Sequence, residues 1–124
     1  MDIYIIIDPQ NVDKFKPKAD KIKQQLENNK YIKIKPKLEN NMDKNSLCLI
    51  FSDNLAYVKS NCSKLKCSAI NITSNLQSEY ILGILNYVKD IFFLKAETDT
   101  IVTRIVNRIS IGKEYRKRGM DFEK

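Results

Sequence analysis

Side chains that can do phosphate or metal chemistry follow several apolar runs of this chain. They are, in chain order, Asp8, Ser52, Asp53, Thr73 and Ser74, with Lys95 after the last such run. A carboxylate in such a place can accept a phosphoryl group, and two carboxylates that lie close together can share a divalent cation. The same residue types also form turns and cap helices. The elements that carry these residues decide which role applies.

Five apolar segments predict the strands that position these residues. The first, "DIYIIID", is a continuous β-branched and aromatic run, typical of a strand buried on both faces. The second, "YIKIK", alternates apolar residues with Lys and therefore predicts a strand at the edge of the sheet. The other three segments are "SLCLIF", "CSAINI" and "IFFLK".

Apolar residues at helical spacing predict four helices between and after these strands. The first carries Phe15, Ala19, Ile22 and Leu26, and we expect it to begin near Asp13 or Lys16, with Pro17 in its first turn. The second follows residues 53–54, either of which can cap it, and the third is introduced by residues 74–75. The last runs from near residue 99 at least to residue 111. Residues 37–45 are expected to form a loop.

This order of elements predicts an α/β fold with a three-layer, doubly wound, five-stranded parallel sheet of order 2-1-3-4-5, as in flavodoxin-like proteins. We expect one domain over residues 1–112, followed by a basic tail or helix extension at residues 113–124. The carboxyl ends of parallel strands share one edge of the sheet. Asp8 and Asp53 would then follow neighbouring strands, with their carboxylates within reach of one metal ion.

The set of residues on this edge resembles the receiver domain of two-component response regulators. The resemblance implies that Asp8 helps to hold Mg²⁺, that Asp53 accepts phosphate, and that Thr73 or Ser74 and Lys95 contact the phosphoryl group. It also implies that Phe92, three residues before Lys95, takes the place of the family's aromatic switch residue.

Three departures from the receiver pattern indicate a degenerate member. Receivers carry an acidic pair after the first strand, whereas this chain has Asp8-Pro9-Gln10. A single carboxylate weakens a Mg²⁺ site, because hard cations need charged oxygen ligands. The helix between the second and third strands is missing, and Ala96 follows Lys95 where the family has Pro. We therefore expect a non-catalytic regulatory or binding domain with no required cofactor, Mg²⁺ being the one ion that the resemblance implies.

Two enzyme classes remain as alternatives. The segment "IIIDPQNV" resembles the start of the PIN-like ribonucleases, in which clustered acids bind two metal ions that activate water. Only 44 residues separate Asp8 from Asp53, and Glu39 and Asp43 are the only acidic candidates between them. The segment "CLIFSDNLAYVKSNC" resembles the third strand and following helix of a TIR-like nucleotide-sensing domain, but no catalytic Glu is evident in the expected place.

The net charge of +7 is concentrated in two regions, which suggests phosphate-bearing partners. Residues 14–37 hold nine Lys against two acids, and the end of the chain is also basic. The first and last helices should lie on the same face of the sheet, where their cations can form one surface. The candidate contacts with a nucleic-acid backbone are Lys14, Lys18, Lys21, Arg104, Arg108, Arg116, Lys117 and Arg118. A protein partner is the other expectation.

The remaining composition argues against several other classes. Three Cys without CxxC spacing, in a chain without His, argue against a zinc site or a Cys/His nucleophile. Gly83, Gly112 and Gly119 all lie outside strand-to-helix turns, which disfavours a dinucleotide cofactor. The apolar runs are too short for a membrane span, and no charged signal-peptide start is present, so we expect a cytoplasmic protein with no membrane partner.

Overall fold

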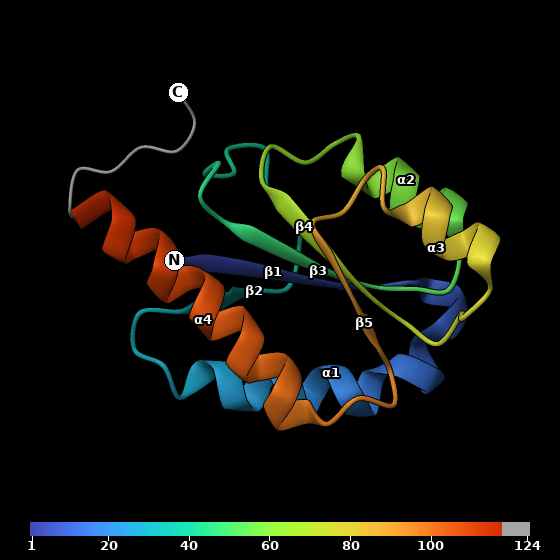
Figure 1. Cartoon of the computed structure of the whole chain (residues 1–124), viewed down its shortest axis with the longest axis horizontal. Helices are drawn as coiled ribbons and strands as arrows, with labels where there is room; N and C mark the ends of the chain where they lie inside the picture. Colours follow the sequence, from blue (N-terminus) through green and yellow to red (C-terminus); the bar gives the residue numbers. More distant parts are fainter. Residues whose placement is uncertain (118–124) are drawn as a thin grey trace.

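Five parallel strands form the centre of the fold in this computed structural model, which describes residues 1–117 and the side chains of residues 1–108 (Figure 1). The strands are β1 (Asp2–Ile7), β2 (Lys33–Lys35), β3 (Leu47–Phe51), β4 (Ser68–Thr73) and β5 (Asp90–Phe93). The helices are the 3-10 turn η1 (Pro9–Asn11), α1 (Val12–Glu27), α2 (Leu55–Cys62), α3 (Ser78–Ile84) and α4 (Thr98–Lys117).

The sheet has the order β2-β1-β3-β4-β5, and every pair of neighbouring strands is parallel. This confirms the predicted flavodoxin-like, receiver-like architecture. The register pairs Ile7 with Phe51 and Phe51 with Ile72, so β1, β3 and β4 end at the same edge of the sheet. We call this edge the carboxyl-end rim.

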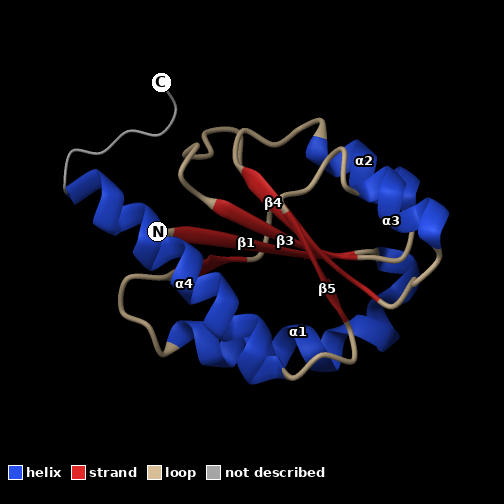
Figure 2. Ribbon diagram, in the orientation of Figure 1, coloured by secondary structure: helices blue, strands red, loops and turns tan. Residues whose placement is uncertain are grey.

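The helices cover the sheet in two layers (Figure 2). On one face, α1 and α4 pack together, and the buried stripe of α1, Phe15, Ala19, Ile22 and Leu26, is the one predicted from its spacing. On the other face, α2 and α3 cover a second cluster that includes Tyr4, Ile50 and Val58. Successive side chains of a strand point to opposite faces of the sheet. Because helices cover both faces, β3 is buried over its whole length.

The first helix begins at Val12, close to the predicted start near Asp13, but Pro17 does not lie in its first turn as predicted. Asp8 accepts a hydrogen bond from the N–H of Gln10, and this contact starts the η1 turn that leads directly into α1 at Val12. Pro17 therefore lies inside the helix, beyond its first turn. Its ring removes one backbone hydrogen bond on the exposed side of α1.

The predicted burial of β1 on both faces is wrong for its second half. Ile5, Ile6 and Ile7 are only half-buried. The reason is that β2 pairs with β1 only as far as Tyr4, and residues 36–46 cross to β3 without a helix. The predicted loss of the helix between β2 and β3 is confirmed, and it leaves this part of the sheet thinly covered.

The last helix crosses residue 112 without a break and continues to Lys117. Arg118 lies outside the described residues, and the side chains of Arg116 and Lys117 lie outside the described side chains. Within residues 1–117, no helix combines the length and the apolar composition needed to cross a bilayer.

Candidate functional site

Asp53 lies at the centre of a hydrogen-bonded cluster on the carboxyl-end rim. Its Oδ1 accepts from Thr73 Oγ1 at 2.7 Å and from the backbone N–H of Ser74 at 2.6 Å. Its Oδ2 accepts from Ser74 Oγ at 2.6 Å and from Lys14 Nζ at 2.7 Å. Both carboxylate oxygens are thus held by two donors each, and the side chain is 18% exposed.

These donors stabilise the ionised form of Asp53. Burial raises the pKa of the carboxyl group, but the hydrogen bonds from Lys14, Ser74 and Thr73 outweigh it. The net result is a pKa well below the usual value of an aspartate. Asp53 is therefore a carboxylate at any physiological pH, and its charge is neutralised inside the protein by Lys14.

The lysine that pairs with Asp53 comes from α1, whereas the resemblance to receivers implied Lys95. Lys95 is exposed, and among the described residues no hydrogen bond or ion pair joins it to Asp53. Lys14 was expected only as a contact for nucleic acid. One signal in the sequence could have found it: a helix that directly follows a strand begins on the same edge where that strand ends, so its first-turn side chains border the rim.

Asp8 has a different set of partners. It is 2% exposed, and its Oδ2 accepts from Ser52 Oγ at 2.8 Å while its Oδ1 accepts from the N–H of Gln10. The register of β1 and β3 places Asp8 level with Ser52. Asp8 thus bonds toward β3, whereas Asp53 bonds to β4 residues and to Lys14. The two carboxylates therefore accept hydrogen bonds from different donors and share none.

The helix that follows β3 is capped by Asn54, whose Oδ1 accepts from the N–H groups of Ala56 and Tyr57. Asp53 is therefore free of the capping role that its position also suggested. The third helix begins at Ser78, after the residues 74–75 that were expected to introduce it, and its N-cap residue Gln77 forms no side-chain cap hydrogen bond. Ser74 instead donates hydrogen bonds to Asp53 from its backbone N–H and its hydroxyl group.

Asn71 and Tyr80 form a buried polar network beside the rim, and this network was not identified from the sequence. Asn71 is fully buried in β4 and donates from Nδ2 to the carbonyl oxygens of Ile50 and Ser52. Its Oδ1 accepts from the hydroxyl group of Tyr80 at 2.8 Å. Burial raises the pKa of Tyr80 to about 12, so this hydroxyl remains a donor. A polar residue in the middle of the apolar run "CSAINI" was the available signal.

The acids between β1 and β3 lie apart from this cluster. Glu39 forms an ion pair with Lys35 at 3.1 Å, and Asp43 accepts from the N–H of Asn45 in a turn before β3. Among the described residues, no group of three or more acidic or Cys side chains is arranged to hold a metal ion. A Mg²⁺ site at Asp8 and Asp53 therefore stays a prediction, and it would have to compete with the donors already present.

The chain matches no protein-family model, and a comparison with curated proteins found no match. Solved structures do match. A protein assigned as the pilus assembly protein CpaE2 from Sinorhizobium meliloti 1021 superimposes with a TM-score of 0.57 at 13% identity, covering 85% of this chain and 97% of that one. A pilus assembly-related protein from Burkholderia pseudomallei K96243 gives a TM-score of 0.53 at 10% identity, covering 89% and 90%. What these comparisons show is a shared fold.

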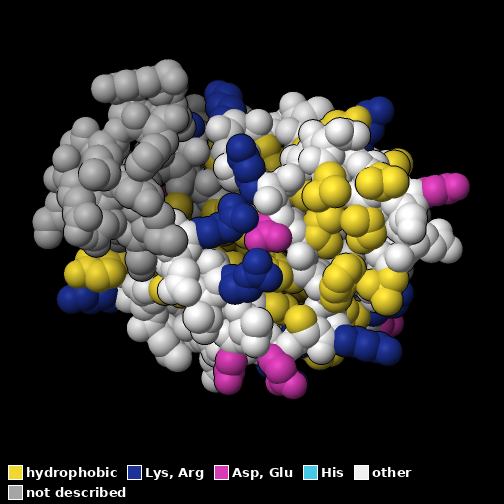
Figure 3. Space-filling model, in the orientation of Figure 1, with side chains coloured by type: hydrophobic (Ala, Val, Ile, Leu, Met, Phe, Trp, Pro, Cys, Tyr) yellow, Lys and Arg dark blue, Asp and Glu magenta, His cyan; other side chains and the backbone are white. Residues whose placement is uncertain are grey.

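Most of the described cations that were proposed to contact nucleic acid are engaged within the protein. Lys18 donates to the carbonyl oxygen of Ala96, and Arg108 forms an ion pair with Asp90 at 3.1 Å. Arg104 stacks over the ring of Phe92, with 5.3 Å between the guanidinium carbon and the ring centroid. In the view of Figure 3, basic side chains gather around a single acidic one, beside a field of apolar side chains.

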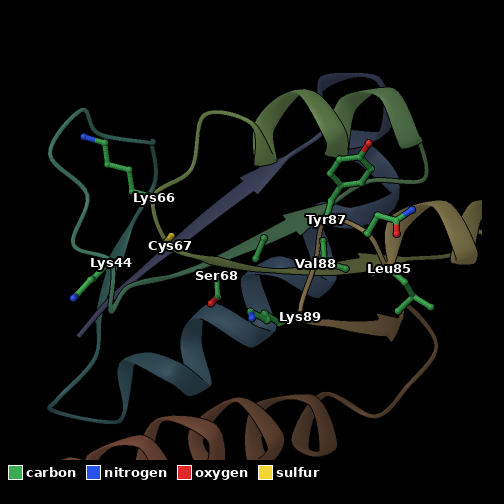
Figure 4. A pocket seen from close by; sticks show the side chains of 10 residues that line it. Lys44, Lys66, Cys67, Ser68, Leu85, Tyr87, Val88 and Lys89 are labelled. Carbon is green, nitrogen blue, oxygen red and sulfur yellow. The ribbon is translucent and has the colours of Figure 1, made fainter. Parts of the chain in front are cut away.

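A hollow lies at the amino end of β4, on the edge of the sheet opposite the rim. It encloses about 370 Å³ and is lined by Lys44, Lys66 and Lys89, together with Ser68, Leu85 and Tyr87. In Figure 4 the side chains of Lys44 and Lys66 extend outward, away from Ser68 and Lys89. The three ammonium groups therefore do not converge on one point.

Proposed function

We propose that the chain is a non-catalytic regulatory domain of receiver-like type, in which Asp53 is a structural carboxylate of the rim and not a phosphoacceptor. The observation that carries this proposal is the fourfold hydrogen bonding of Asp53 by Lys14, Thr73 and Ser74. The domain would act by binding, without turnover.

The chemistry of phosphoryl transfer supports this assignment. A carboxylate oxygen attacks phosphorus with a lone pair, and here each oxygen already accepts two hydrogen bonds, so attack would have to displace at least one donor. The transferred group also needs cations to neutralise its charge. Asp8, the acid that would help to hold Mg²⁺, is buried and bonded to Ser52.

The nuclease alternative is less well supported. Two-metal hydrolysis needs several acids around one space, yet Glu39 and Asp43 are engaged elsewhere. The partner that we favour for the regulatory domain is another protein, with a nucleic-acid backbone as the second candidate because α1 and α4 share one face. Assembly of a larger machine is one setting for such a domain, since its fold occurs in two proteins assigned to pilus assembly.

Incubation with acetyl phosphate and Mg²⁺, followed by intact-mass measurement, tests the proposal. We expect no phosphoryl adduct on the wild-type chain. The variant Asp53→Asn serves as the matched control, because it marks any phosphorylation at another residue. A near-stoichiometric adduct on the wild type that disappears in Asp53→Asn would overturn the proposal and restore the phosphoacceptor role.

A further inference from the structure

The edge of β1 is open over its last three residues. β1 pairs with β3 from Ile3 to Ile7, but with β2 only from Asp2 to Tyr4. β2 ends at Lys35, immediately before Pro36. The hydroxyl group of Tyr57 approaches the carbonyl oxygen of Ile7 at 3.4 Å, which places that backbone acceptor within reach of a side chain instead of a neighbouring strand.

A groove of about 530 Å³ lies along this open edge. Ile5, Ile6 and Ile7 contribute to its floor, Lys23 of α1 to one wall, and Tyr57 and Asn61 of α2 to the other. Since α1 and α2 cover opposite faces of the sheet, the groove is a slot over the edge of the sheet and not a hollow on one face. A single extended strand can pair with the open strand edge along such a slot, whereas a helix cannot, because a helix uses its backbone N–H and C=O groups internally. We call it the β1 edge groove.

The side chains that border the β1 edge groove are apolar on both faces of the sheet. Ile5 and Ile7 belong to the cluster beneath α1 and α4, together with Ile34. On the other face, Ile6 packs with Leu38 and Tyr57. All six are only partly buried. An occupant with successive apolar residues would therefore bury surface on both of its sides.

The charge around the β1 edge groove is positive. Lys23 and Lys37 line it, and none of the residues that line it is acidic. The acid nearest to Lys23 is Glu27, at 3.9 Å and with both side chains about half exposed, so this pair is weak. Acidic residues beside an apolar segment would complement the two lysines.

We propose that the β1 edge groove binds an extended segment of a partner protein, about three apolar residues long with acidic residues at its ends, which adds to the sheet beside Ile5–Ile7. Main-chain hydrogen bonds to the open edge would supply affinity, and the apolar and basic walls would supply selectivity. Three residues of strand span about 10 Å, which matches the unpaired part of β1. This surface is separate from the Asp53 cluster, so a failure here leaves the result of the phosphorylation test unchanged.

The probe is a labelled peptide with three consecutive valines flanked on each side by two glutamates, titrated with the full chain by fluorescence anisotropy. We expect saturable binding, weakened at least about tenfold when the three valine nitrogens are methylated, because methylation removes the strand hydrogen bonds and keeps the side chains. Amide chemical-shift changes upon binding should centre on residues 5–7.

Charge reversal in the groove provides the matched comparison. The double variant Lys23→Glu/Lys37→Glu should bind the peptide at least about fivefold more weakly, whereas Lys44→Glu/Lys66→Glu, in the hollow of Figure 4, should bind within about twofold of wild type. Absence of binding at millimolar protein would overturn the proposal, as would equal affinity for the methylated peptide. Shift changes at residues 5–7 that depend on protein concentration without peptide would assign the edge to a second copy of the chain and would also overturn it.

Discussion

At the scale of single residues, the hydrogen bonds of Asp53 decide what the rim can do. A carboxylate open to solvent is a nucleophile and a metal ligand, whereas one bonded to four donors is part of the protein framework. Asp53, which follows β3, joins residues from two other elements, because Lys14 comes from α1 and Thr73 from β4. The same contacts that lower its pKa therefore tie the rim together.

Replacing Asp53 with Asn should destabilise the protein in a pH-dependent way. The folded-state pKa of Asp53 lies below its value in the unfolded chain, so its contribution is fully present above about pH 4 and is lost as the pH falls. We expect Asp53→Asn to lower the free energy of unfolding by about 1–3 kcal/mol at pH 7, and by less at pH 2.5. Urea denaturation at both pH values measures the difference.

The matched control for this measurement is Asp20→Asn. Asp20 pairs with Lys16 on the exposed side of α1, and both side chains are about 60% exposed. Such a pair contributes less than about 1 kcal/mol. A difference at Asp53 no larger than that at Asp20, or one that does not change with pH, would show that the donors around Asp53 do not hold it.

At the scale of elements, the strands and their order were predictable and the contacts between elements were not. Apolar runs bounded by polar residues marked all five strands, and the stripe from Phe15 to Leu26 marked α1. The pairing of Lys14 with Asp53 spans 39 residues and depends on where α1 meets β3. Local spacing carries no signal for such a pair. The late start of β2 was also missed, because Lys33 and Lys35 are in the strand but Tyr31 is not.

The contact between α3 and β4 yields a second prediction. Tyr80→Phe removes the hydroxyl group that donates to Asn71 Oδ1 and leaves that buried oxygen without this donor. We expect a loss of about 1–3 kcal/mol in the free energy of unfolding. Tyr87→Phe is the control, since Tyr87 is 39% exposed and its change should cost less than about 0.5 kcal/mol. Equal stability of the two variants would mean that the Asn71 network contributes nothing.

At the scale of the whole molecule, the distribution of charge bears on the choice of partner. The helices α1 and α4 pack on one face and carry all five of the candidate cations whose side chains are described. Contacts with Asp53, Ala96 and Asp90 occupy Lys14, Lys18 and Arg108. Lys21, by contrast, forms no hydrogen bond or ion pair among the described residues, and it is exposed. This internal use of cations is the reason that we rank a protein partner above nucleic acid.

Binding to a short labelled DNA duplex tests the nucleic-acid candidate. If the shared face of α1 and α4 binds phosphates, the triple variant Lys18→Ala/Lys21→Ala/Arg104→Ala should lose most of its affinity at low salt, and the wild type should weaken steeply as salt rises. The control Lys59→Ala/Lys64→Ala changes two exposed cations, one on α2 and one just after it, on the other face. No binding at low salt, or equal losses in both variants, would remove this candidate.

The most direct test of the regulatory, non-phosphorylated rim is an equilibrium titration with beryllofluoride and Mg²⁺, followed by amide chemical shifts. Beryllofluoride mimics a bound phosphoryl group without hydrolysis, so a short-lived adduct cannot escape detection. We expect the amides of Asp53, Thr73 and Ser74 to keep their shifts, because Lys14 and the two hydroxyl groups already hold the carboxylate. Saturable shifts at these three residues that require both Mg²⁺ and beryllofluoride, and that vanish in Asp53→Asn, would contradict the account.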